Sequence, residues 1–295
     1  MEFRDFFSPV GRWSLESGLS IEATAGGFLG FDFTHLPSAV LPNDDPPADN
    51  MLELAIQAMR ERVQVINAFA LCLHSATVEF DKFSYGGFRI THEDLVHYDD
   101  LRQGHGGPGM KHLPLIPLQG YLLPHPSRHG VVPASTIEHA CKLLDSVLGC
   151  SHPKSLALVA LTNHALSACK GHDFELAVAS AWTACESLLQ TLWDTYTHAQ
   201  ATSHGLSVSK NRRAYWSGRD FTASIIVEVM TLAGTIAPKL SIAIGEVRSR
   251  RNKWIHGVAA ASYQDAIAAV TLARDLLHEV MDLDFKVAPS VGVSF

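Results

Sequence analysis

The chain has 295 residues, of which 47% are apolar and 18% are charged, and its formal net charge at pH 7 is −7. This composition excludes a wholly disordered, collagen-like or coiled-coil chain, and the length allows two ordinary domains or one large one. A chain this acidic is not a general nucleic-acid coat protein, so any contact with nucleic acid must use a local basic patch.

Residues 1–133 are predicted to form a domain of mixed α and β structure, because the composition changes near residue 133. They hold most of the prolines and many of the glycines. The elements expected here, in chain order, are short strands at 19–23 and 28–33, a helix at 51–74, a hairpin at 78–90 and a loop from 92 to 133. We expect this domain to sense a trigger or to select substrates, although no motif within it specifies which.

Residues 134–285 are predicted to form an all-helical bundle, followed by a tail at 286–295, which makes the fold class α+β. The expected helices are 135–149, 153–170, 173–197, 220–234, 238–256 and 262–282. Asp173 is placed to cap the third of these helices, and Gly257 to end the fifth in the left-handed conformation. The polar segment 198–219 is interpreted as a loop.

Cysteine usage and the lack of long apolar runs predict a cytoplasmic protein that makes no membrane contact. The best candidate for a membrane span, 156–168, is interrupted by polar residues, and the N-terminal residues lack the basic-then-apolar order of a secretory signal. The five cysteines form no CxxC pair, and most of them fall inside apolar patterns, which is typical of reduced core thiols.

Basic residues are concentrated in one window of this acidic chain. Nine basic and three acidic residues lie between positions 205 and 257, so this window carries +6 and the remainder carries −13. Within it, one loop interleaves bases with aromatic rings: Lys210, Arg212, Arg213, Tyr215 and Trp216. Such a surface suits phosphate binding and base stacking. The alternative interpretation is a solvated loop beside a solvated helix face.

One carboxylate is predicted to be buried on the helix at 173–197. Val178, Trp182, Leu189 and Trp193 form an apolar stripe on this helix, and Glu186 falls on the same stripe. Because an unpaired buried charge is very costly, Glu186 needs a cation or a set of hydrogen-bond donors.

One guanidinium is predicted to be buried on the helix at 238–256. Ile244, Val247 and Trp254 form its apolar stripe, which also includes Arg251. Arg251 and Glu186 are complementary in charge and in predicted burial, so we expect them to meet across two packed helices.

Two further polar side chains share a face close to Arg251. Asn252 and His256 are four residues apart and therefore lie on neighbouring turns of one face. Arg251 and His256 are separated by about 140° around the helix, so they can flank a shared groove. The C-terminal end of a helix also favours a protonated imidazole.

Two sequence runs together resemble the HEPN superfamily, in its Apea-like branch. The run at 251–257, RNKWIHG, resembles the HEPN signature of an arginine, a polar residue, a short spacer and a histidine near a helix end. The run at 179–189, ASAWTACESLL, resembles the acid-bearing helix of the same superfamily. The resemblance covers roughly residues 135–285 and does not extend to the first 130 residues.

The resemblance implies a metal-independent endoribonuclease that acts as a homodimer, with two Arg/His motifs facing each other and no cofactor. By this resemblance His256 is the general acid or base, Arg251 binds phosphate, Asn252 orients or donates a hydrogen bond, and Glu186 holds Arg251. Nearby cations would supply further charge for RNA: Arg248, Arg250 and Lys253. Histidine titrates near neutrality, and arginine offers a forked donor to phosphate oxygens, so these residue types suit cleavage by the RNA 2′-hydroxyl.

Other interpretations of the same residues stay open. Some members of the superfamily bind RNA or a partner without cutting, and the four polar side chains could merely tie two helices together. A role in phage defence or in toxin-like growth control is implied only by the kinds of protein in which such helical domains occur. A metal site is not expected, because the histidines between 92 and 139 lack a ligand frame.

Overall fold

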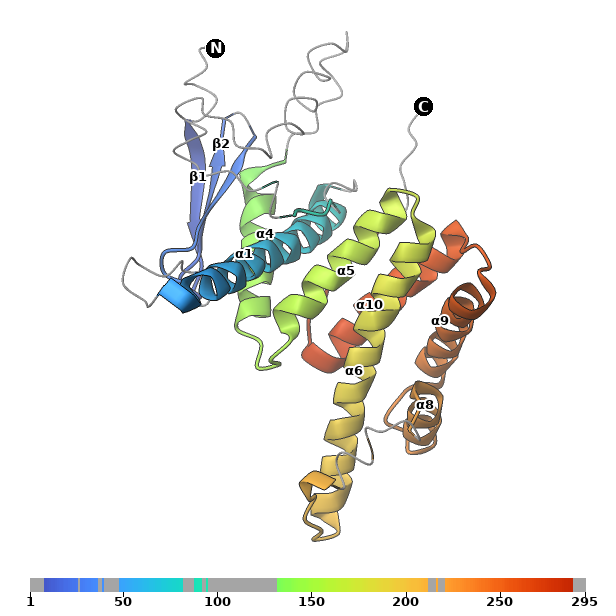
Figure 1. Ribbon diagram of the computed structural model, residues 1–295. Coiled ribbons are helices and arrows are strands. Elements are labelled where there is room, and N and C mark those ends of the chain that lie inside the picture. Colours follow the sequence, from blue (N-terminus) through green and yellow to red (C-terminus); the bar gives the residue numbers. More distant parts are fainter. Residues whose placement is uncertain are drawn as a thin grey trace. The chain divides into compact units, whose positions relative to one another are not determined.

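The computed structural model shows an α+β fold, which consists mostly of helices and contains one small antiparallel sheet among the described residues (Figure 1). It describes residues 8–25, 27–36, 39, 48–81, 88–91, 94, 132–211, 216 and 221–288. The chain divides into two compact units, Met1–Ala160 and Leu161–Phe295. The division falls within helix α5, Ser155–Lys170, and therefore later than the boundary expected at residue 133.

The first unit holds a three-stranded antiparallel sheet of order β1-β2-β3. The strands are β1, Pro9–Ser14, β2, Ser20–Thr24, and β3, Leu29–Asp32. β2 and β3 were expected from the sequence, whereas β1 was not. β1 is an edge strand whose residues are mostly exposed and include Pro9 and Gly11, so it lacks the apolar alternation that marks a half-buried strand.

The long helix α1, Ala48–Ala76, packs against α4, Ala134–Leu148, within the first unit. Asp145 of α4 also accepts hydrogen bonds from the backbone N–H groups of Glu16 (2.9 Å) and Ser17 (3.3 Å), in the turn between β1 and β2. These contacts explain why the boundary lies after α4, although the composition changes before it.

The start of the hairpin expected at 78–90 is helical instead. A π-helical turn, Thr77–Asp81, continues directly from the end of α1. A short run that alternates apolar and polar residues is compatible with either structure, and continuity with a long preceding helix decides in favour of the helix. Residues 82–87, which include the expected turn, lie outside the described residues, as does most of the expected loop from 92 to 133.

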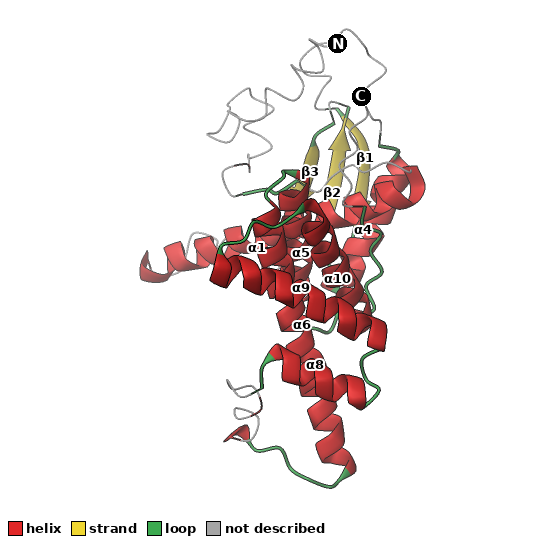
Figure 2. Cartoon of the chain, turned by 90° about the vertical axis from the view of Figure 1, so that its right-hand side faces the viewer, coloured by secondary structure: helices red, strands yellow, loops and turns green. Residues whose placement is uncertain are grey.

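The second unit is built from α6, Phe174–Ser203, α8, Ala223–Leu232, α9, Pro238–Gly257, and α10, Tyr263–Met281, together with the end of α5. Asp173 caps α6 as predicted, because its carboxylate accepts from the backbone N–H of Leu176 at 3.1 Å. α10 packs along α6, and α8 and α9 lie against α6 (Figure 2).

α6 continues beyond the expected end at 197, so the first residues of the expected loop at 198–219 are helical. The added turn contains Ala199, Gln200 and Ala201, which favour helix. The Thr202 hydroxyl donates a hydrogen bond to the carbonyl of His198 at 2.9 Å. The polarity of this segment therefore indicated exposure to water rather than a loop.

Each unit has its own apolar core, and the cysteines belong to these cores. All five are free, four are buried, and burial raises the pKa of the Cys141 thiol to about 12.

One helical stretch among the described residues, Leu52–Phe80, is long and apolar enough to cross a membrane, although no such stretch was expected from the sequence. Of its most apolar window 67% is buried inside the structure, as in the core helix of a soluble protein.

Candidate functional site

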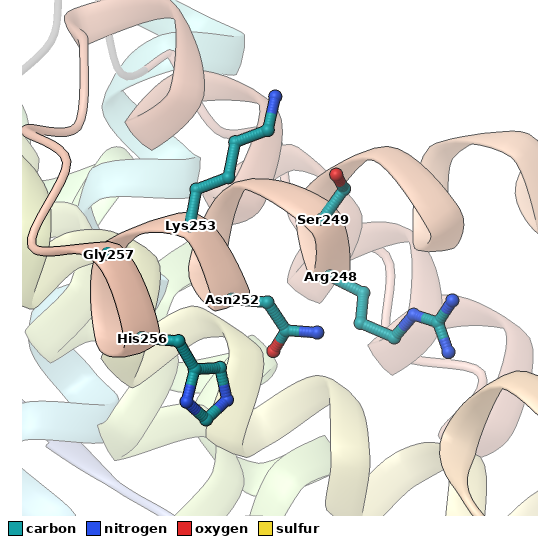
Figure 3. A pocket seen from close by; sticks show the side chains of 6 residues that line it. All are labelled: Arg248, Ser249, Asn252, Lys253, His256 and Gly257. Carbon is teal, nitrogen blue, oxygen red and sulfur yellow. The ribbon is translucent and has the colours of Figure 1, made fainter.

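The last three turns of α9 line an open groove of about 530 Å³. The groove is lined by Arg248, Ser249, Asn252, Lys253, His256 and Gly257. Figure 3 shows that Arg248, Asn252 and His256 project from the same side of the helix, whereas Ser249 and Lys253 project from the other. A spacing of four residues places successive side chains of this row about 6 Å apart along the helix axis.

Burial of the neighbouring face of α9 fixes the direction in which this row points. Ile244 and Val247 are 2% and 1% exposed, so that face packs into the second unit. Arg248 and Asn252 follow these residues at positions rotated away from the packed face, and both are half buried. The same apolar stripe that holds the helix in place therefore turns the polar row toward the groove.

Arg251 occupies its expected place in the stripe of α9, but it is half buried rather than buried, and its partner is its own neighbour in the chain. Its Nη1 donates to Oδ1 of Asn252 at 3.0 Å. Within the described part of the chain, Arg251 has no carboxylate within 4.0 Å. Because Oδ1 of Asn252 accepts from Arg251, the amide nitrogen is left as a donor, and Figure 3 shows this nitrogen turned toward Arg248.

The prediction that Glu186 is buried and meets Arg251 is wrong. Glu186 is exposed, and the structure contains no ion pair between these two residues. Counted around the helix, Glu186 lies about 80° from Val178, at the edge of the stripe and beyond the last apolar side chain. A carboxylate at an edge position turns toward water, because water solvates it at no desolvation cost.

The three further cations of α9 that were predicted to bind RNA differ in their availability. Arg248 and Lys253 line the groove, and their side chains make no ion pair with the described residues. Arg250, in contrast, forms an ion pair with Asp265 of α10, whose side chain is only 15% exposed. Arg250 is therefore committed to the packing of α9 on α10.

Little of the basic and aromatic loop falls within the described residues. Lys210 is exposed, and Trp216 is half buried with its backbone carbonyl accepting from Nε1 of Trp193 at 3.2 Å. Three residues predicted to bind RNA lie outside the described residues: Arg212, Arg213 and Tyr215. The structure does not bring Lys210 or Trp216 into the α9 groove.

His256 lies in the last turn of α9 and is exposed to solvent. The left-handed residue that ends the helix is Val258, with φ of 50°, and not Gly257, which is the last helical residue. The backbone N–H of Val258 donates to the carbonyl of Trp254 at 2.8 Å. The helix therefore ends one residue later than the sequence indicated, with a β-branched residue where glycine is usual.

The groove has the chemistry of an anion site. Its lining contains a guanidinium, an ammonium, an amide and an imidazole, and no carboxylate. Among the described residues there is no cluster of three or more side chains that could hold a metal ion. Of the histidines considered as metal ligands between 92 and 139, His139 is the one among the described residues, and its Nε2 lies 3.6 Å from Oε2 of Glu79.

Sequence reasoning missed the contacts that fix the turn after His256. Ser262 and Asp265 form a capping box at the start of α10, and Asp265 also forms an ion pair with Arg250. A serine followed three residues later by an acid, before an apolar run, is a recognisable helix start and could have indicated this cap. The ion pair with Arg250 has no such sequence signal, because it depends on how two helices pack.

No protein-family model, curated protein or solved structure matches this chain. The resemblance to HEPN domains therefore rests on the sequence runs at 179–189 and 251–257.

Proposed function

We propose that the groove on α9 binds the phosphate backbone of RNA and cleaves it without a metal ion. One observation carries the proposal: Arg248, Asn252 and His256 form a row on one helix side, beside a groove whose lining contains no carboxylate. A row of donors suits a polyanion, and an exposed imidazole at its end adds a group that can accept or donate a proton.

The exposed position of Glu186 supports phosphate binding by Arg251. A guanidinium neutralised by a buried carboxylate is a poor ligand for phosphate, and that was the difficulty with the expected pair. Among the described residues the Arg251 guanidinium donates to the neutral amide of Asn252 and pairs with no carboxylate, so its charge is not neutralised, and it lies beside the groove lining through its contact with Asn252. The guanidinium and the amide together offer several N–H donors to phosphoryl oxygens.

The proposed reaction is attack by the RNA 2′-hydroxyl on the adjacent phosphorus. The hydroxyl loses its proton to a base, the bond from phosphorus to the 5′-oxygen breaks, and an acid protonates that oxygen. His256 performs one of the two proton transfers, and Arg248 and Arg251 stabilise the charge on the phosphoryl oxygens. One chain supplies one histidine to the groove, so the second transfer is assigned to His256 of a second copy in a two-fold assembly.

Binding of RNA without cleavage is the second candidate function. It is favoured by the number of histidines that one chain supplies to the groove. A single imidazole lines the groove, and no second imidazole or carboxylate accompanies it among the described lining residues. A groove of this kind, used by one chain alone, would hold phosphate without completing both proton transfers.

The test uses the full chain, a single-stranded RNA oligonucleotide and excess chelator. We expect cleavage that leaves a 2′,3′-cyclic phosphate. This cleavage should be lost in His256→Ala and kept in His198→Ala. His198 is the matched control, because it is an exposed histidine on α6 away from the groove. Cleavage that persists unchanged in His256→Ala would remove this histidine from the mechanism.

Binding is measured separately with a 2′-deoxy oligonucleotide, which cannot be cut by this route. Binding that weakens in Arg248→Ala, without any cleavage of RNA, would select the noncatalytic function. Failure to bind at all would contradict both candidates.

A further inference from the structure

The chain that follows His256 is held by contacts that have no evident role in the groove itself. Val258 adopts a left-handed conformation, which is unfavourable for a β-branched residue, and its side chain is 85% exposed. Packing of the Val258 side chain therefore cannot hold this conformation. The backbone N–H groups of Val258 and Ala259 donate to the carbonyls of Trp254 and Lys253 at 2.8 and 3.3 Å and close the helix end, while contacts further along the chain restrain the turn as a whole.

Two contacts beyond Val258 supply this restraint. The carboxylate Oε1 of Glu175, in the first turn of α6, accepts the backbone N–H of Ala261 at 2.9 Å. The second contact is the ion pair between Arg250 and Asp265, which joins α9 to the start of α10. His256 thus lies in a stretch of chain whose two ends are tied together by one ion pair and whose final turn is tied to a third helix.

The Asp265 side chain is well placed to make this a rigid arrangement. Oδ2 of Asp265 accepts a hydrogen bond from the backbone N–H of Ser262 at 2.9 Å, and the backbone N–H of Asp265 donates to Oγ of Ser262 at 3.2 Å. With the Arg250 contact, one carboxylate serves both the cap of α10 and the junction with α9. At 15% exposure its charge is screened less by solvent than that of a surface pair.

We propose that Glu175 is a positioning residue for the groove: by accepting the N–H of Ala261 it fixes the left-handed end of α9 and therefore the direction of the His256 imidazole. The Arg250–Asp265 pair acts with it by joining α9 to the start of α10. This inference rests on the proposed function for its catalytic meaning, but the placement of His256 can be measured without any RNA.

The experiment compares Glu175→Met with Glu175→Gln in the full chain by NMR. Methionine is similar in size but accepts no strong hydrogen bond, whereas glutamine keeps an Oε1 acceptor. In Glu175→Met we expect shifted His256 ring-proton signals and exchange of the Val258 and Ala259 amide protons that is faster by about tenfold, since a restraint on the turn is lost. Glu175→Gln should restore both toward wild type.

Glu279→Ala is the matched control, because Glu279 is an exposed carboxylate near the far end of α10. If Glu175→Met does not fold, Glu175→Ala gives the same test, since alanine also removes the acceptor for the Ala261 N–H and is favourable in a helix. Unchanged His256 signals in the folded variant, whichever of the two is used, would overturn the proposal.

If the wild type cleaves RNA, Glu175→Met should lower kcat with little change in KM, and Glu175→Gln should recover kcat, because the restraint orients His256 rather than binding RNA. If the wild type does not cleave, while the His256 signals move as described, the proposed cleavage fails and the positioning role stands.

Discussion

Nη1 of Arg251 donates to Oδ1 of its neighbour Asn252 at 3.0 Å, and this contact stands where an ion pair with Glu186 was expected. The two residues are adjacent on α9, so the contact needs no second helix. It leaves the Asn252 amide with its nitrogen as a donor toward the groove and leaves Arg251 without a carboxylate partner among the described residues. The groove is cationic because Arg248 and Lys253 line it and no carboxylate does, and its lining residues all belong to this one helix.

The first prediction concerns Asn252→Asp. A carboxylate at this position would pair with Arg251 and would replace the amide donor by a negative charge facing the phosphate. We expect binding of a 2′-deoxy oligonucleotide to weaken about tenfold, more than in Asn252→Ala, because repulsion is added to the loss of a donor. Fluorescence anisotropy at one fixed salt concentration measures both variants. Equal losses in the two variants would show that charge at this position is not felt by the ligand.

A second prediction follows from the exposure of Glu186. Glu186→Ala should change the free energy of unfolding by no more than about 0.5 kcal/mol, since exposed side chains without partners contribute little. Oligonucleotide binding should also stay at the wild-type level. Urea unfolding and anisotropy check the two quantities. A loss of several kcal/mol would mean that the carboxylate takes part in a buried network after all.

The third prediction tests the junction between the sheet and α4. Asp145→Ala removes the acceptor of the Glu16 and Ser17 backbone N–H groups and should cost about 1–2 kcal/mol in the first unit, because both donors lose a charged partner. Asp145→Asn should lose less, since one oxygen remains.

The matched control for Asp145 is Glu138→Ala on the same helix. Its carboxylate pairs with Lys142 at 2.7 Å on the exposed face of α4, and such pairs add little to stability. Thermal unfolding of the three variants should place Glu138→Ala nearest to wild type. A larger loss in Glu138→Ala than in Asp145→Ala would contradict the assigned junction.

The fourth prediction is a pH dependence that arises from Lys170. Burial in the last turn of α5 lowers the pKa of the Lys170 ammonium from 10.5 to about 8. Between these two values the unfolded chain binds more protons than the folded chain, so this group makes stability rise as pH increases through that window. Below about pH 8 the group is charged in both states and its unfavourable contribution is constant.

Lys170→Met should therefore stabilise the protein at pH 7 and remove this rise. Lys154→Met is the control, because Lys154 is exposed just before α5. The difference between each variant and wild type, from urea unfolding at pH 7 to 10, isolates the lysine from cysteine and tyrosine titrations. A constant difference between Lys170→Met and wild type over that range would contradict the lowered pKa.

The candidate site shows which kinds of inference a sequence supports. Helical periodicity predicted α9, its buried stripe at Ile244 and Val247, and the shared face of Asn252 and His256, because these depend only on spacing along one helix. The same periodicity placed Glu186 inside, since it cannot tell a position within a stripe from one at its edge.

The sequence alone determined the fold class, the order and type of most helices, the Asp173 cap and the concentration of cations around α9, since each follows from local spacing or composition. Only the tertiary structure decided which groups meet across elements: Arg250 with Asp265, and Glu175 with the backbone of Ala261. Ion pairs and turns between helices depend on the rotation and separation of whole elements, and those are set by packing of the core rather than by any residue's neighbours in the chain.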